Sequence, residues 1–200
     1  MIICCHRINT IKELKNIPHN FGIEVDINVF GKKLCLSHDA STNGVSLNSF
    51  LKHYKHKFII FNIKSEGLEI RVLELIKKFK IKKYFFLDSS FPFIYKLSKT
   101  ITKNFAIRVS DYENINTALK MTNRVKWIWL DCFKKYSISI KLINKLKINN
   151  FKICLVFPDL HGREVQASDK LFYKNLNRNN IRPDMICIKK RNIDSIDLFF

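Results

Sequence analysis

The chain has 200 residues, of which 46% are hydrophobic, and it contains only five glycines and four prolines. This length and composition predict one folded domain with a substantial core and exclude a disordered or collagen-like chain. Lys and Arg number 36 against 17 Asp and Glu, which gives a net charge of +19. No apolar run approaches the roughly 18 residues of a membrane-spanning helix, and the first residues lack a basic leader, so we expect neither a transmembrane segment nor a signal peptide.

The net positive charge is compatible with a nucleic-acid, anionic-lipid or phosphate-bearing partner. The lysines are spread along the whole chain, however, and no zinc-finger spacing, Gly-aromatic RNA motif or basic coiled coil is present. We therefore expect solvated helix faces with a weak attraction to anionic surfaces, and no specific nucleic acid partner. The sequence leaves the oligomeric state open.

The cysteines indicate the compartment. They lie mostly within apolar runs and lack the C-x-x-C spacing of zinc or redox sites. We therefore predict buried free thiols, a reducing environment and a cytoplasmic location. The six residues are Cys4, Cys5, Cys35, Cys132, Cys154 and Cys187.

Eight apolar runs predict strands, and each is followed by a segment with the apolar spacing of a helix. The predicted strands cover residues 1–5, 21–29, 58–64, 84–88, 105–109, 127–130, 151–157 and 185–188. The predicted helices cover residues 10–16, 46–55, 67–79, 91–99, 112–121, 137–148, 168–177 and 193–199. Thr10, Ser46 and Asp111 are the predicted N-caps of three of these helices. A short segment, 33–37, is predicted to run back beside the second strand.

This alternation predicts the fold class. Continuous apolar strands are typical of parallel sheets that are buried on both faces. Eight strand–helix repeats without a linker predict an α/β protein, a compact (β/α)₈ TIM barrel that forms a single domain over residues 1–200. A doubly wound open sheet is the alternative.

The second predicted strand carries two acids. Because side chains alternate along a strand, Glu24 and Asp26 lie on one face, and the aliphatic residues between and beside them lie on the other. Two carboxylates that point the same way need a positive partner. A hard divalent cation with oxygen ligands is the simplest one.

The ends of the predicted strands are strongly polar. In a (β/α)₈ barrel the C-terminal ends of the strands converge on the active face, so we expect these side chains to form one ring. A ring of acids, histidines and bases has the groups that a phosphate-ester site needs. The residues are His6, Arg7, Glu24, Asp26, His38, Asp39, Asn62, Lys64, Asp88, Arg108, Asp131, Asp159, His161, Lys189 and Lys190.

Three of these motifs together resemble the glycerophosphodiester phosphodiesterase family, which belongs to the phosphatidylinositol-phospholipase-C-like phosphodiesterases. The motifs are His6-Arg7, Glu24-x-Asp26 and His38-Asp39, all within the first 40 residues, with Asn62-Ile63-Lys64 in the place of the family's acidic-x-Lys strand. The resemblance implies that His6 and His38 are the acid/base pair. It also implies that Glu24 and Asp26 bind a divalent cation, Mg²⁺ or Ca²⁺, and that Arg7 and Lys64 bind the substrate phosphate.

The chain departs from the family pattern at two positions. Ile8 stands where the family usually has Gly, and Asn62 stands where the family has its third acidic metal ligand. Asn62 can still bind a hard cation through its carbonyl oxygen, but it supplies no charge, so a weaker metal site is expected. Asp88, one strand further on, is a possible additional ligand. The long insertion that usually follows the His-Asp motif is missing.

The predicted function is therefore hydrolysis of a small phosphodiester, either a glycerophosphodiester or a phosphoglycan-type linkage. The first alternative is a catalytically degenerate barrel that binds phosphate-bearing ligands, and a basic nucleic-acid-binding protein is the second. Individual residues also have structural alternatives. The acids can form a metal-free ion network with Arg7 and Lys64, and His38 can be a solvent-facing residue beside a turn-forming Asp39. We expect Arg108, Asp131 and Asp159 to be salt-bridge partners and 161–163 to be a flexible polar loop.

Overall fold

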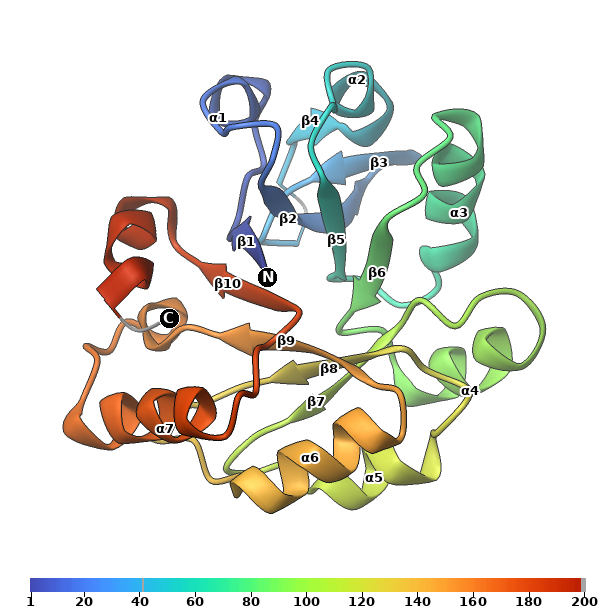
Figure 1. Ribbon diagram of the computed structural model, residues 1–200. Helices are drawn as coiled ribbons and strands as arrows, with labels where there is room; N and C mark the ends of the chain where they lie inside the picture. Colours follow the sequence, from blue (N-terminus) through green and yellow to red (C-terminus); the bar gives the residue numbers. More distant parts are fainter. Residues whose placement is uncertain (41, 199–200) are drawn as a thin grey trace. The chain divides into compact units, whose positions relative to one another are not determined.

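The computed structural model describes residues 1–40 and 42–198 (Figure 1). The chain divides into two compact units. One consists of Cys4–Phe105, and the other of Met1–Ile3 together with Ala106–Phe200. We describe each unit by itself.

The Cys4–Phe105 unit is built on parallel strands with an antiparallel extension. The first strand, β1 (Ile2–Cys5), pairs in parallel with β2 through Cys4 and Cys5, β2 pairs in parallel with β5, and β5 with β6. On the other side β2 continues through the antiparallel strands β3 and β4. The elements are α1 (Ile11–Lys15), β2 (Gly22–Phe30), β3 (Lys33–Leu36), β4 (Val45–Ser46), α2 (Leu47–Leu51), β5 (Phe58–Ile63), α3 (Glu69–Lys78), β6 (Tyr84–Leu87) and α4 (Phe91–Thr100).

The Ala106–Phe200 unit repeats the same alternation with parallel strands only. Strand β7 pairs with β8, β8 with β9 and β9 with β10. The elements are β7 (Ala106–Val109), α5 (Ile115–Lys120), β8 (Trp127–Leu130), α6 (Ile140–Ile148), β9 (Lys152–Val156), the 3-10 helix η1 (Pro158–His161), α7 (Ala167–Arg178), β10 (Met185–Ile188) and the 3-10 helix η2 (Lys190–Leu198).

The strands are buried along nearly their whole length, which agrees with their continuous apolar sequence. All residues of β5, β8 and β10 are buried, as are the first seven of β2. Strands covered on both faces gain stability from every aliphatic and aromatic side chain, about 25 cal/mol per Å² of apolar surface removed from water. The eight predicted strand–helix repeats are confirmed.

Two local predictions are confirmed in detail. Thr10 caps α1: its hydroxyl accepts from the Glu13 N–H at 3.1 Å, and the Glu13 carboxylate accepts from the Thr10 N–H at 2.9 Å. This reciprocal pair satisfies two N–H groups that the helix itself leaves without partners. All six cysteines are buried thiols, as expected.

The predicted cap of α5 is wrong. The helix was expected to begin after Asp111, but it begins after Asn114, whose side chain accepts from the Asn116 N–H at 2.8 Å. The Asp111 carboxylate instead accepts from the backbone N–H groups of Phe133 and Lys134, at 3.0 and 2.9 Å. Asp111 was predicted to cap the helix, but its side chain binds the loop after β8 instead.

The helix predicted over residues 46–55 is shorter than expected. It covers only Leu47–Leu51, and Ser46 makes no side-chain cap because its backbone pairs with Cys35 as part of β4. The last predicted helix, 193–199, is the 3-10 helix η2, and residue 199 lies outside the described residues. Among the described helices, none is both long and apolar enough to cross a bilayer.

A buried ion pair stabilises the Ala106–Phe200 unit. Asp169 is fully buried and accepts two hydrogen bonds from the Arg163 guanidinium, at 2.6 and 3.0 Å, and one from the Gln166 N–H at 2.9 Å. The Arg163 Nε–H also donates to the Cys132 carbonyl oxygen at 3.2 Å, so the pair connects the start of α7 to the loop after β8.

We expect Asp169→Asn to lower the free energy of unfolding by about 3 kcal/mol, because it leaves the guanidinium without its counter-charge in a buried position. Urea denaturation followed by circular dichroism measures the change. Asp194→Asn, an exposed acid in η2, is the matched control and should lie within about 0.5 kcal/mol of the unsubstituted protein. Equal loss in both variants would contradict the assignment.

Candidate functional site

The pairing of β2 with β5 places three polar side chains next to one another. Glu24 and Asp26 lie two residues apart on β2 and so share a face, and Asp26 is the register partner of Asn62 on the neighbouring parallel strand. Both carboxylates are fully buried, and Asn62 is 5% exposed. The sheet therefore brings together the three residues that were predicted from the family resemblance to be metal ligands.

The loop after β1 turns sharply over Glu24. Arg7 has a φ of +56°, in the left-handed region, and its backbone N–H donates to Glu24 Oε2 at 2.7 Å. The next N–H, that of Ile8, donates to the Glu24 carbonyl oxygen at 2.8 Å. His6 Nε2 lies 3.7 Å from Glu24 Oε2. His6 is thus beside the acid pair, as expected.

Asn9 is a site residue that the sequence reasoning missed. Its Nδ2 donates to Asp26 Oδ2 at 2.9 Å, and its Oδ1 accepts from the Asp26 N–H at 2.9 Å. Asn9 follows the His-Arg motif within a loop, and no periodicity or spacing distinguished it. Only the folding of the loop across β2 indicates its role, which is to fix the orientation of the Asp26 carboxylate.

Two cations neutralise Asp26. Lys64 Nζ lies 3.3 Å from Asp26 Oδ1, and Arg7 Nε lies 3.9 Å from Asp26 Oδ2. The same Lys64 ammonium is 4.0 Å from Asp88 Oδ2, so the additional ligand considered for the metal contacts the lysine. The ion network proposed as an alternative to a metal site is present around Asp26.

The network leaves buried oxygens without donors. Among the described residues, Glu24 Oε1 and Asn62 Oδ1 are buried and accept no hydrogen bond, and the buried Asp26 Oδ1 lacks a hydrogen bond but lies 3.3 Å from Lys64 Nζ. Buried polar atoms usually have partners, because an unsatisfied group costs about 1–3 kcal/mol. These three oxygens, on the neighbouring strands β2 and β5, fit the ligand preference of Mg²⁺ or Ca²⁺.

A metal at this position would depend on the amide of Asn62. The described residues contain no group of three or more His, Cys, Asp or Glu arranged to hold a metal ion. The candidate set is therefore two carboxylates and one amide oxygen, which carries less charge than three carboxylates.

The pKa of Glu24 is raised because its buried charge is not fully compensated by neighbouring groups. Burial raises the pKa to about 8, and the neighbouring Asp26 charge raises it as well. The Arg7 N–H, the Asn62 amide and Lys64 oppose the rise without cancelling it. Glu24 therefore retains a proton near neutral pH until a cation stabilises its charged form.

His38 lies at the start of the loop after β3. The preceding residue, Ser37, donates its N–H to the Asp26 carbonyl oxygen at 3.1 Å, which holds this loop against β2. The His38 side chain is 44% exposed, and its Nδ1 lies 2.8 Å from Asp39 Oδ1. The backbone thus brings His38 near Asp26 on β2, while the side chain of His38 is paired with that of the next residue, Asp39.

In the Ala106–Phe200 unit, the polar residues at the strand ends form a separate cluster. Arg108 is paired with Asp131, and Asp159 accepts from the Lys189 N–H at 3.1 Å and from Asn192 at 2.7 Å. The salt-bridge role expected for Arg108 and Asp131 is confirmed. Asp159 is held by hydrogen bonds from a backbone amide and a side-chain amide.

Residues 161–163 were expected to form a flexible polar loop, but two of their side chains are held by buried acids. The ring nitrogen Nε2 of His161 is hydrogen-bonded to Asp131, and Arg163 is held by Asp169. Asp131 lies 30 positions before His161, so the local pattern did not indicate this contact, whereas Asp169 lies only six positions after Arg163.

Comparison with known proteins identifies the fold. No protein-family model and no curated protein matches the chain. Among solved structures, it is similar to a protein of Agrobacterium tumefaciens str. C58 assigned as a glycerophosphoryl diester phosphodiesterase, with a TM-score of 0.68 and 9% identity over 99% of this chain and 97% of that one.

Two further structures are similar over nearly the whole chain. One is a glycerophosphodiester phosphodiesterase from the same organism, with a TM-score of 0.64 and 12% identity over 94% of this chain and 96% of that one. The other is a glycerophosphoryl diester phosphodiesterase from Parabacteroides distasonis ATCC 8503, with a TM-score of 0.62 and 12% identity over 98% and 86%. The chain has the (β/α)₈ barrel fold of these enzymes, which confirms the predicted fold class and supports the resemblance that the N-terminal motifs indicated.

We expect the metal-free protein to lose stability as the pH rises from about 5 to 8. The pKa of Glu24 is about 8 in the folded chain and 4.5 as its ordinary value, so the folded state binds the extra proton in this window. Each pH unit can then cost up to about 1.4 kcal/mol. Glu24→Gln stays neutral and should lack this decline, so its stability relative to the unsubstituted protein should rise with pH.

Urea denaturation in EDTA at pH 5 and pH 8 measures both slopes. Glu74→Gln, at an exposed position of α3, is the control and should keep the slope of the unsubstituted protein. Parallel slopes for Glu24→Gln and the unsubstituted protein would show that Glu24 ionises normally.

Proposed function

We propose that the chain is a metal-dependent phosphodiesterase of the glycerophosphodiester phosphodiesterase family, forming a single barrel domain over residues 1–200. Its substrate is a small phosphodiester, either a glycerophosphodiester or a phosphoglycan-type linkage. The observation that carries the proposal is a set of three neighbouring buried oxygens: Glu24 Oε1 and Asn62 Oδ1, which have no donor, and Asp26 Oδ1, which lies beside the Lys64 ammonium. The likeness to three such enzymes in fold supports it.

Glu24, Asp26 and Asn62 hold Mg²⁺ or Ca²⁺ in this proposal. When bound, the cation neutralises the negative charge of the diester and of its transition state. The protein prepares the site by fixing both carboxylates from behind: the Arg7 N–H holds Glu24, and Asn9 holds Asp26. Rigid ligands of this kind lose little conformational freedom when the cation and substrate bind.

Arg7 and Lys64 bind the phosphate oxygens. The Arg7 side chain is 49% exposed and the Lys64 side chain 21% exposed, so both can reach a ligand while they remain near Asp26. A guanidinium can form two parallel hydrogen bonds to a phosphate, and an ammonium adds a compact charge.

His6 and His38 transfer the protons. One imidazole accepts a proton from the attacking hydroxyl or water, and the other, in its protonated form, donates one to the departing alkoxide oxygen. The hydrogen bond between His38 and Asp39 orients the His38 ring. His6 lies beside Glu24, so its imidazole is close to the proposed metal and phosphate.

A non-catalytic barrel that binds phosphate-bearing ligands is the second candidate, and one observation favours it. The Lys64 ammonium lies 3.3 Å from Asp26 Oδ1, so a lysine already supplies positive charge to one of the proposed metal ligands. Asn62 in place of an acid points the same way. Such a protein would bind ligands in EDTA and turn over none of them.

Hydrolysis of bis(p-nitrophenyl) phosphate and of glycerophosphodiesters, with Mg²⁺, Ca²⁺, Mn²⁺ or EDTA, tests the proposal. We expect cation-dependent turnover that Glu24→Ala abolishes and that His6→Ala and His38→Ala each lower by about 10²–10⁴-fold. Glu74→Ala and His53→Ala, at exposed positions of the same unit, are the matched controls. Turnover that survives Glu24→Ala would place the chemistry elsewhere, and ligand binding without turnover would favour the second candidate.

The Asn62→Asp variant tests the metal ligands without relying on turnover. It adds the third negative charge to the oxygen set, so we expect cation affinity to rise about tenfold, which corresponds to ~1.4 kcal/mol. Isothermal titration with Mg²⁺ and Ca²⁺ measures the dissociation constants. Asn28→Asp, on β2 beyond the acid pair, adds the same charge as a comparison. An unchanged affinity in Asn62→Asp would remove Asn62 from the ligand set.

A further inference from the structure

The second polar cluster of the molecule is centred on Asp131, at the end of β8 in the Ala106–Phe200 unit. Asp131 is 1% exposed, and its two oxygens accept from four donors. The donors are the Arg108 guanidinium, Trp129 Nε1 at 3.1 Å, the Cys132 N–H at 2.9 Å and His161 Nε2. This carboxylate holds together residues from the ends of β7, β8 and β9.

The ionised Asp131 carboxylate fixes the orientation of the His161 ring. Burial acts to raise the pKa of Asp131, but the hydrogen bond from His161 and the charge of Arg108 outweigh it, and the pKa is lowered. Asp131 is thus ionised at neutral pH and can only accept, so His161 Nε2 carries the proton of this bond. His161 Nδ1 is the other ring nitrogen and is the one that can form a hydrogen bond with a ligand.

Aromatic rings from three loops meet at this cluster. The rings of Phe133 and His161 have centroids 4.4 Å apart, and those of Phe133 and Tyr112 are 5.9 Å apart at 62°. Phe133 is 38% exposed and Tyr112 66% exposed. Adjacent exposed rings are unfavourable in water, and such surfaces commonly mark ligand sites.

The charges around the rings are balanced. Asp111, Glu113 and Asp131 contribute three negative charges, and Arg108, Lys134 and Lys135 contribute three positive ones, whereas the protein as a whole is strongly basic. A nucleic acid attracted by the overall charge would not bind best here. A neutral ligand would meet no such penalty.

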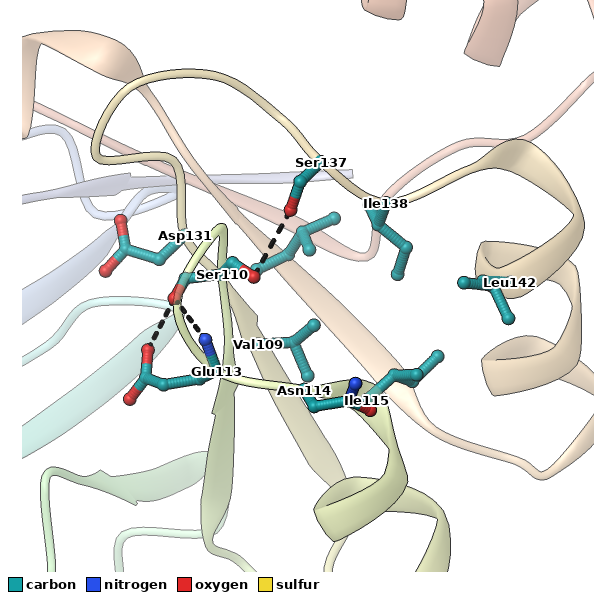
Figure 2. Close-up of a pocket in the computed structure, with 10 residues that line it drawn as sticks. Val109, Ser110, Glu113, Asn114, Ile115, Asp131, Ser137, Ile138 and Leu142 are labelled. Atoms are coloured by element: carbon teal, nitrogen blue, oxygen red, sulfur yellow. Dashed lines mark hydrogen bonds between the residues drawn. The ribbon is translucent and has the colours of Figure 1, made fainter.

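A small cavity adjoins the cluster and adds hydrogen-bonding groups. It has a volume of about 120 Å³ and shares Ser110, Glu113 and Asp131 with the cluster. Figure 2 shows the Asp131 and Glu113 carboxylates on one side of Ser110, and the apolar Ile138 and Leu142 on the other. The Ser110 hydroxyl donates to Glu113 Oε2 at 2.7 Å and so holds this acid in place.

We propose that this cluster is a binding site for a neutral pyranose ring. The weakly positive C–H groups of one sugar face pack against the exposed ring of Phe133, and Tyr112, whose ring centroid lies 5.6 Å from the Lys134 ammonium, contacts the edge of the sugar. One sugar hydroxyl, which can donate or accept, forms a hydrogen bond with His161 Nδ1, and another donates to the Glu113 carboxylate. Arg108, between Asp131 and Glu113, donates to a sugar oxygen. The proposal does not rest on the phosphodiesterase activity of the other unit.

Saturation-transfer NMR and isothermal titration with the methyl α-glycosides of glucose, galactose and N-acetylglucosamine, in EDTA, test the proposal. We expect at least one glycoside to bind with a dissociation constant of about 1 mM, since a ligand of this size buries little surface. Phe133→Ala and Tyr112→Ala should each weaken it about three- to tenfold, the value of one aromatic contact. Tyr95→Ala, an equally exposed aromatic of the other unit, is the control.

Two further measurements separate the parts of the site. His161→Phe keeps a ring beside Phe133 but removes the nitrogen that hydrogen-bonds the sugar, so it should weaken binding while circular dichroism shows an intact fold. Adenosine is the comparison ligand, because a nucleobase also stacks on aromatic rings. No saturation transfer from any glycoside, equal binding in Phe133→Ala and Tyr95→Ala, or tighter binding of adenosine would each overturn the proposal.

Discussion

The structure of the Cys4–Phe105 unit depends on the burial of two carboxylates side by side on β2. Neither Glu24 nor Asp26 is exposed to water, and each would be costly to bury as an isolated charge. The loop after β1 crosses β2 so that the Arg7 N–H and Asn9 reach these acids, and Lys64 reaches Asp26 from β5. The left-handed backbone at Arg7 is the local strain that this arrangement requires.

The two acids are compensated unequally, and the difference connects the fold to its proposed chemistry. Asp26 has two cations and an amide around it, whereas the raised pKa of Glu24 shows that its charge is not balanced. A buried group in this condition is stabilised by a proton or by a metal ion. In the proposed function, a bound cation would offset the folding cost at Glu24.

Asp131 in the other unit is a buried acid whose charge is fully compensated. It too is a buried acid at the end of a strand, but four donors satisfy it and its pKa is lowered. A satisfied acid does not need a cation, and its effect is to hold its donors in place. His161 and Arg108 are therefore fixed side chains, which suits recognition of a ligand by hydrogen bonds.

The sequence by itself determined the features that follow from local periodicity: the strand–helix alternation, the shared face of Glu24 and Asp26, and the cap at Thr10. These depend on side-chain alternation and on hydrogen bonds within one turn of helix, which neighbouring residues specify. Only the tertiary structure decided that Asn9 holds Asp26 and that Asp131 holds His161, contacts that join residues 17 and 30 positions apart. Such pairs depend on how strands and loops are brought together, and an asparagine or histidine in a loop has many possible partners until the chain has folded.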